Sequence, residues 1–278
     1  MWQNAWPKRR KLLRININHC AVRYFIELAY DGTAYHGWQI QPNASSVQGV
    51  INDALAKLFR PDAAYIVGCG RTDTGVHADY FVAHFDLDHP IDDLDRALFK
   101  LNSILPPDIA VYSLQLVDDE LHSRFSATER TYFYRLATNK SPQMRWRTYH
   151  PYFQPDYELM NRAAELLIGE QDFTSFSRLH TQTNNNICDV RIARWELYDG
   201  QNWQFRITAN RFLRNMVRAV VGTLFDVGRG KMTIEQFANI ISARDRALAS
   251  TSAPPQGLSL VDVIYPEGHG FIAKSRIL

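Results

Sequence analysis

A glycine-bracketed segment at residues 70–75, with the sequence GRTDTG, places a guanidinium and a carboxylate two positions apart. Glycine permits positive backbone φ angles and lets a ligand approach the main chain closely. Functional side chains are common on loops that rigid elements hold in place. The segment lacks the Gly-x-x-x-x-Gly-Lys pattern of a phosphate-binding loop. Arg71 and Asp73 are therefore either a surface ion pair or charged groups of an active site, and their spacing alone does not choose.

Two further stretches combine aromatic and polar side chains. Residues 30–41 hold three aromatic residues and a histidine, which suits either base stacking in an RNA complex or an aromatic turn packed on a sheet. Residues 124–135 are basic and aromatic, and strand alternation places Tyr132 and Tyr134 on one face. Because a buried tyrosine needs a partner for its hydroxyl, Tyr132 belongs either to the core or to a binding site.

Three arginines near residue 214 have the spacing of a helix. We predict a helix over residues 212–228, on which Arg211, Arg214 and Arg218 form one ridge at i, i+3 and i+7. Apolar residues cover the other side of this helix, and a guanidinium beside them would seek a carboxylate or a phosphate. The alternative is an amphipathic helix with a solvated basic stripe.

The elements that would position these residues alternate regularly in the first half of the chain. Their order is β-α-β-β-α-β, the ferredoxin-like split βαβ arrangement. We predict strands at 23–30, 64–69, 79–86 and 109–117, and helices at 47–58 and 94–105. The proline pair at 106–107 ends the second helix.

The second half of the chain echoes this order. We predict strands at 131–137, 190–198, 203–209 and 258–264, helices at 159–167, 212–228 and 234–241, and a long polar loop at 169–186. The Asp199-Gly200 pair predicts a hairpin between the two middle strands. We therefore expect an α+β two-layer fold of two ferredoxin-like halves, whose antiparallel sheets form one continuous central sheet with a catalytic cleft between them. The expected divisions are a basic tail at 1–20, a first domain at 21–118 that carries the Asp73 loop, and a second domain at 119–278 with additional helices.

Composition narrows the function classes without naming one. The 278 residues are 46% hydrophobic and carry a net charge of +2, which neither supports nor excludes a nucleic-acid partner. The basic run at 8–11 is expected to be a solvated tail. Three widely spaced cysteines (Cys20, Cys69 and Cys188) predict a reducing compartment, and neither Cys-x-x-Cys nor His-x-x-x-His spacing occurs, so we expect no metal. Without an apolar run near 20 residues, we expect no membrane partner.

Taken together, seven segments resemble the TruA family of tRNA pseudouridine synthases. In chain order they lie at 30–39, 46–48, 70–78, 125–132, 172–176, 216–224 and 257–265. The resemblance extends from about Arg23 to Tyr265, and several separate motifs in the same order make it specific. One departure is Thr74, which stands where the family usually has alanine.

The resemblance implies a role for each matching residue. Asp73 corresponds to the catalytic aspartate, and Arg218 to the basic residue that pairs with it. Arg71 corresponds to the arginine that helps to move the target base out of the stack. Tyr132 corresponds to the tyrosine that packs on the uracil, and Leu258 to an apolar residue of the base pocket. Beyond these, Arg211 and Arg214 are candidates for phosphate contacts to RNA.

The family's reaction also sets what the protein would and would not need. It isomerises uridine to pseudouridine, in the TruA family at positions 38, 39 and 40 of the tRNA anticodon stem-loop, and the family resemblance implies a cytoplasmic homodimer. Breaking the C1′–N1 bond, rotating the uracil and joining C1′ to C5 involves neither redox change nor phosphoryl transfer, so no cofactor is expected. The carboxylate of Asp73 would attack the sugar at C1′, attack the base at C6, or abstract a sugar proton, and the sequence does not choose among these routes.

Two other functions compete with this interpretation. A non-catalytic RNA-binding protein could also contain two ferredoxin-like units, but the aromatic strand motif of RRM domains does not occur here. A hydrolase of glycosidic bonds would usually need two carboxylates with separate roles, and the 70–75 loop offers only one. Release of the C5 hydrogen from uridine would exclude the binder, and free uracil as product would favour the hydrolase.

Overall fold

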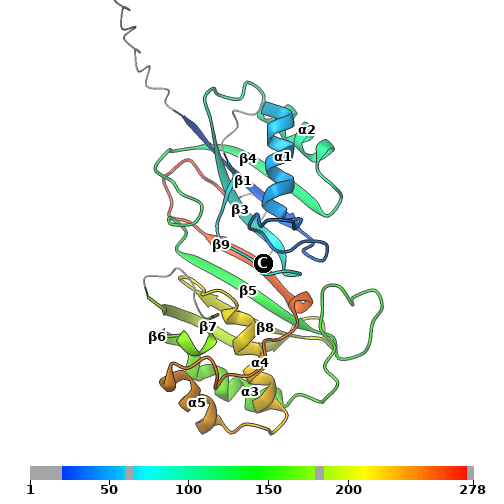
Figure 1. Ribbon diagram of the computed structural model, residues 1–278, viewed down its shortest axis with the longest axis vertical. Coiled ribbons are helices and arrows are strands. Elements are labelled where there is room, and N and C mark those ends of the chain that lie inside the picture. Colours follow the sequence, from blue (N-terminus) through cyan, green and yellow to red (C-terminus); the bar gives the residue numbers. More distant parts are fainter. Residues whose placement is uncertain (1–20, 60–64, 179–184, 274–278) are drawn as a thin grey trace, which may run out of the picture.

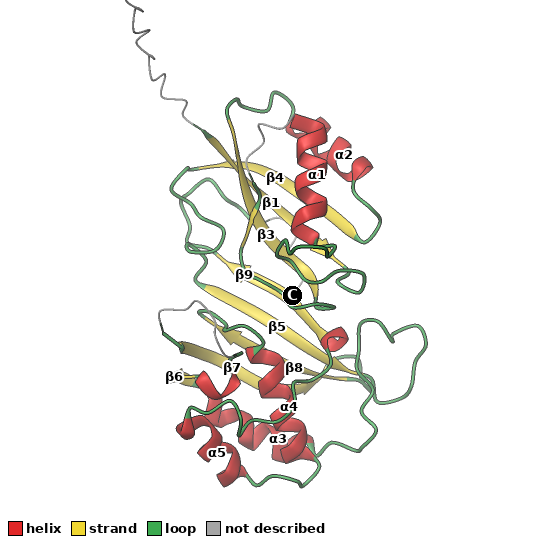
Figure 2. Cartoon of the chain, viewed as in Figure 1, coloured by secondary structure: helices red, strands yellow, loops and turns green. Residues whose placement is uncertain are grey.

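The structure, a computed structural model, describes residues 21–59, 65–178 and 185–273. Its centre is an open mixed sheet with the strand order β4-β1-β3-β9-β5-β8-β7-β6, and β2 pairs with β3 beside this path. The helices form a second layer in two groups, α1 with α2 and α3 with α4 and α5, as Figure 2 shows. The expected α+β two-layer fold with a continuous central sheet is confirmed. The basic run at 8–11 and Cys20 lie outside the described residues.

The first half of the chain has the predicted order of elements. They are β1 (Val22–Tyr30), α1 (Val47–Phe59), β2 (Val67–Gly68), β3 (His77–Leu87), α2 (Leu94–Ile104) and β4 (Ile109–Val117). The sheet order β4-β1-β3-β2 is that of a split βαβ unit. The buried sides of β1 and β3 carry large aromatic rings that pack under α1, among them Phe85 stacked on Phe59 at 6.0 Å between ring centroids.

The second half adds an edge strand and extra helices to the same plan. Its elements are β5 (Glu129–Leu136), α3 (Tyr157–Ala164), β6 (Gly169–Asp172), β7 (Ile187–Leu197), β8 (Trp203–Ala209), α4 (Met216–Gly228), α5 (Ile234–Ala243) and β9 (Leu258–Ile264). Short 3₁₀ helices follow α3, follow β6 and precede β9. The order β9-β5-β8-β7 repeats that of the first half.

Strand β9 joins the two halves of the sheet, as Figure 1 shows. It runs parallel to β3, where His77 pairs with Ser259, and antiparallel to β5, where Tyr132 pairs with Leu260. The last strand of the sheet therefore lies between the beginning of β3, which follows the Asp73 loop, and the strand that carries Tyr132.

One sequence prediction in the second half is wrong in part. Residues 169–186 were expected to form a polar loop, but Gly169–Asp172 is a strand that pairs with β7 from Ile187 to Val190. An edge strand has one partner only, and this one is partly exposed along its length, so it lacks the apolar alternation that identifies a half-buried strand. Residues 179–184 of the same stretch lie outside the described part of the chain.

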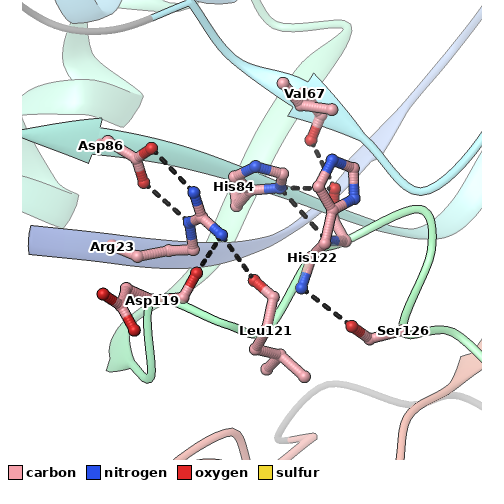
Figure 3. Close-up of polar contacts among 9 residues, drawn as sticks. Arg23, Val67, His84, Asp86, Asp119, Leu121, His122 and Ser126 are labelled. Carbon is pink, nitrogen blue, oxygen red and sulfur yellow. Dashed lines mark hydrogen bonds and ion pairs between the residues drawn. The ribbon is translucent and has the colours of Figure 1, made fainter. Parts of the chain in front are cut away.

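The connection between β4 and β5, residues 118–128, is fastened to the first half by polar contacts that Figure 3 shows. The Arg23 guanidinium donates to both carboxylate oxygens of Asp86, at 2.8 and 2.9 Å, and to the carbonyl oxygens of Asp119 and Leu121. Bidentate pairing of this kind fixes the orientation of the guanidinium. The beginning of the connection is thereby held against β1 and β3.

A second contact in this connection involves a buried histidine. Nδ1 of His84 in β3 lies 2.7 Å from the Ser123 hydroxyl oxygen and 3.2 Å from the Ser123 backbone nitrogen. The Ser123 hydroxyl donates to the carbonyl oxygen of Val67 at 2.7 Å (Figure 3). Burial, with a smaller contribution from the Arg23 charge, lowers the pKa of His84 to about 4. The imidazole is therefore neutral in the folded protein at neutral pH.

This depressed pKa predicts that the protein loses stability in acid. As pH falls below 6.5, the unfolded chain takes up the His84 proton before the folded protein does, so stability present above that pH declines towards pH 4 by roughly 3 kcal/mol at most. Urea midpoints measured from pH 7.5 to 4.5 test this. A His84→Gln variant should show a smaller decline over the same interval, and an equal decline in the two proteins would contradict the assignment.

Candidate active site

The loop that carries Asp73 is fixed by backbone and side-chain contacts with residues 30–38. The Trp38 N–H donates to the Thr72 carbonyl oxygen at 3.3 Å, and the Tyr30 hydroxyl lies 2.9 Å from Thr72 Oγ1. Gly37 has φ of +90°, and a Cβ atom there would stand 2.3 Å from the Thr72 oxygen, so only glycine allows this approach. Because Thr72 directly precedes Asp73, these contacts determine where the carboxylate is presented.

The aromatic residues of the 30–41 stretch are part of the core. Trp38 is buried and stacks on Phe81 with 4.2 Å between ring centroids, and Tyr35 is buried and donates to Asp108 at 2.7 Å. Of the two interpretations of this stretch, the aromatic turn packed on the sheet is confirmed. The rings support the Asp73 loop from beneath and do not offer faces for base stacking.

Asp73 forms an ion pair with Arg218. Oδ2 of Asp73 lies 3.3 Å from Nη1 of Arg218, and the two side chains are 22% and 19% exposed. Nε of the same arginine donates to the Ala253 carbonyl oxygen at 2.8 Å, which fixes the plane of the guanidinium. Arg218 stands in the first turn of α4, where the helix dipole disfavours a cation. The Asp73 carboxylate and the Ala253 carbonyl offset that unfavourable position.

The arginine ridge predicted from helical spacing is wrong. Helix α4 begins at Met216 and not near residue 212, because Asn215 adopts a left-handed conformation with φ of 65°, which asparagine tolerates. Arg211 and Arg214 therefore precede the helix, and only Arg218 is on it. Nε of Arg214 still lies 4.0 Å from Oδ1 of Asp73, but its side chain is 49% exposed. Arg211 donates to Asn185 at 3.3 Å.

Arg71 is anchored by a chain of side-chain amides. Its Nε donates to Oε1 of Gln39 at 3.2 Å, and Nε2 of Gln39 donates to Oε1 of Gln48 at 2.9 Å. The buried Gln48 side chain in turn donates to the carbonyl oxygen of Ile66 at 2.7 Å. Arg71 is exposed, so its guanidinium faces solvent from an anchored position.

Tyr132 and Leu258 lie on adjacent strands beside the loop. The Tyr132 side chain is buried, and its ring meets that of Phe212 edge to face at 5.1 Å. Burial is the main cause that raises the pKa of the Tyr132 hydroxyl, with the nearby Asp73 charge among the smaller causes, so the phenol stays neutral. Leu258 is the first residue of β9, is buried, and pairs with Tyr134.

Arg130 is a residue of the site that the sequence reasoning did not single out. Its guanidinium donates to the carbonyl oxygens of Ala127 and Asn210, each at 2.8 Å, of Cys69 at 3.2 Å, and of Arg124 at 2.5 Å. One side chain thus ties together the Asp73 loop, the connection before β5 and the segment before α4. The available signal was its position two residues before Tyr132, on the same face of β5.

Comparison with known proteins supplies the family. The family model described as tRNA pseudouridine synthase matches residues 163–266. The tRNA pseudouridine synthase A of Bacteroides thetaiotaomicron is 53% identical over 247 residues, which are 88% of this chain and 91% of that protein. The namesake from Bacteroides fragilis is 51% identical over 88% of this chain and 97% of its own, and that from Bacillus pumilus is 39% identical over 86% and 97%. This chain belongs to the tRNA pseudouridine synthase A family.

Membership of the tRNA pseudouridine synthase A family confirms the resemblance that the motifs indicated. It makes the protein an isomerase that acts on tRNA. A non-catalytic RNA-binding protein and a hydrolase of glycosidic bonds are both disfavoured by this membership.

Within residues 21–59, 65–178 and 185–273, no group of three or more His, Cys, Asp or Glu side chains is arranged to hold a metal ion. No helix within these residues is both long enough and apolar enough to cross a membrane. Cys69 and Cys188 are both buried and free.

Proposed function

We propose that this protein converts uridine to pseudouridine in the anticodon stem-loop of tRNA, at positions 38, 39 and 40, with Asp73 as the nucleophile and without a cofactor. The observation that carries the proposal is the ion pair of Asp73 with Arg218, formed on a loop whose backbone is fixed. The guanidinium holds the carboxylate, a group that can act as a nucleophile, in a fixed position. Family membership supplies the substrate class.

The proposed reaction is an isomerisation within one nucleotide. The C1′–N1 bond breaks, the detached uracil turns within the pocket, and C5 bonds to C1′. The C5 hydrogen leaves as a proton, and N1 takes up a proton. Product and substrate are isomers, so no electron or group is gained or lost. In one route Asp73 forms a covalent bond to C1′, and in another it forms a covalent bond to C6 of the uracil. In both routes this bond breaks again before the product leaves. The carboxylate serves as base in a third route, which begins with loss of a sugar proton.

We assign the remaining positions to holding the base. Tyr132 and Leu258 would enclose the uracil from β5 and β9, and a neutral phenol suits an apolar contact with a ring. Arg71, exposed and anchored through Gln39, would occupy the space that the target base leaves. Flipping a base out of a stack costs a few kcal/mol, and such a contact offsets part of that cost.

We also propose how the protein is divided and where it acts. The repeated strand order supports a first domain at 21–118 and a second at 119–278, with β9 of the second completing the sheet of the first.

We infer a homodimer in the cytoplasm, to which buried free thiols at Cys69 and Cys188 are suited. Light scattering of the purified protein tests the dimer.

The function is tested with tRNA transcripts that carry tritium at C5 of uridine. Wild-type protein should release tritium to water and produce pseudouridine at positions 38–40, mapped site by site in tRNA from cells with and without the protein. Free uracil among the products would indicate a hydrolase. Binding without any tritium release would indicate an RNA-binding protein.

Arg211 and Arg214 are expected to contact phosphate. Replacing either by methionine should weaken tRNA binding and flatten its dependence on salt concentration by about one unit of slope, because one fewer phosphate is neutralised. Filter binding from 50 to 300 mM KCl measures this slope. A variant with the slope of the wild type would show that its arginine is a solvated surface charge and does not contact phosphate.

A further inference from the structure

Residues 121–128 form a tightly built turn that presents an exposed phenylalanine. Nδ1 of His122 accepts the N–H groups of Arg124 and Phe125, at 3.1 and 3.3 Å, and the His122 N–H donates to Ser126 Oγ at 2.9 Å. The Phe125 ring is nevertheless 75% exposed. The Phe125 ring lies against the His122 ring, with 4.4 Å between ring centroids, so it is supported on one side while most of it stays exposed.

The turn is fastened directly to the proposed active site. The Arg130 guanidinium that bonds the Arg124 and Ala127 carbonyl oxygens also bonds that of Cys69, four positions before Asp73. On the other side, the His122 ring packs edge-on against His84 at 4.6 Å, within the cluster that Figure 3 shows. The Phe125 ring therefore keeps a fixed position relative to the Asp73 loop.

The surroundings of this ring are strongly basic. The Arg124 guanidinium lies 5.6 Å from the Phe125 ring centroid. Burial is the main cause that lowers the pKa of the Arg124 guanidinium, and the positive charges of Arg71, Arg130 and Arg211 lower it further. An apolar protein partner would have to desolvate these cations without compensation. A nucleotide offers a π-face for the ring and a phosphate for the arginines.

We propose that Phe125 is a stacking platform for an unpaired nucleobase of the RNA substrate that flanks the target uridine, with Arg124 contacting the phosphate of that nucleotide. The inference rests on the proposed function, because it takes the Asp73 site as the place where the target uridine is bound. Stacking is tolerant of base identity, since every base has a π-face. The platform would therefore hold neighbours of different sequence in the same position.

A matched pair of variants tests the platform. Phe125→Ala should lower kcat/KM for pseudouridine formation about tenfold, mainly through KM, as loss of one stacked base predicts. Phe99→Ala removes an equally exposed ring (74%) on α2 and should match the wild type. Phe125→Trp should retain most of the activity. Phe125→Ala with wild-type kinetics, or Phe125→Trp as impaired as Phe125→Ala, would overturn the proposal.

A binding signal separates stacking from an effect on folding. We would place 2-aminopurine, in turn, on either side of the target uridine and bind these RNAs to the Asp73→Asn protein. One position should lose fluorescence on binding, and the additional Phe125→Ala change should abolish that loss. If no position responds to Phe125, the inference fails while the function stands. If the wild type releases no tritium from tRNA, the proposed function itself fails.

Discussion

An Asp73→Asn protein should form no pseudouridine, with a loss of more than about a thousandfold in turnover, while it binds tRNA within about tenfold of the wild type. Asparagine has nearly the same shape as aspartate but lacks the charge that makes a carboxylate a nucleophile or a base. The phosphate contacts that we propose for Arg211 and Arg214 do not depend on the charge of Asp73. Turnover and binding are therefore expected to separate.

Tritium release and filter binding on the same preparation measure the two quantities. Asp88→Asn is the matched control, since Asp88 is exposed in the turn after β3 and should tolerate the change. The urea midpoint of each variant shows whether the fold is kept. Near wild-type turnover in Asp73→Asn would remove Asp73 from the reaction.

Arg218→Met should lower turnover by about a hundredfold or more. It leaves the Asp73 carboxylate, only 22% exposed, without its 3.3 Å partner and removes the bond to the Ala253 carbonyl oxygen. Arg218→Lys should recover part of the activity, because one ammonium restores the charge but cannot reach both oxygens in a fixed plane.

Arg214→Met is the matched control for Arg218→Met. Arg214 also faces Asp73, but at 4.0 Å and with half of its side chain exposed, so its removal should change salt dependence more than turnover. Single-turnover rates at saturating tRNA compare the two variants. A larger loss of rate in Arg214→Met than in Arg218→Met would mean that the wrong arginine has been assigned to the carboxylate.

Local signals predicted the elements well wherever a segment buries one face. Helix α1 and strands β4 and β8 follow apolar periodicity, and their predicted positions agree closely with the structure. Strand β6 was missed, because an edge strand with polar residues on both faces has no such periodicity. The beginning of α4 was misplaced, because the left-handed Asn215 interrupts an otherwise helical pattern, and a single backbone angle leaves little trace in residue spacing.

The site depends on contacts that spacing does not reveal. Asp73 and Arg218 are separated by 145 positions along the chain, and only the family resemblance suggested that they meet. The four hydrogen bonds that Arg130 donates to carbonyl oxygens could not be predicted either, because every residue has a backbone carbonyl whatever its side chain. Arg71 and Asp73, two positions apart in the motif, have different partners.

The position of β9 has a consequence for synthesis on the ribosome. Because His77, just after the Asp73 loop, pairs with Ser259, this edge of the first half stays unpaired until roughly 180 further residues have been synthesised. At ordinary elongation rates this takes on the order of 10 to 40 seconds. During that time the unpaired strand edge can bind a chaperone or pair with the wrong strand. A nascent chain surrounded by tRNA would therefore stay inactive until its last strand emerges.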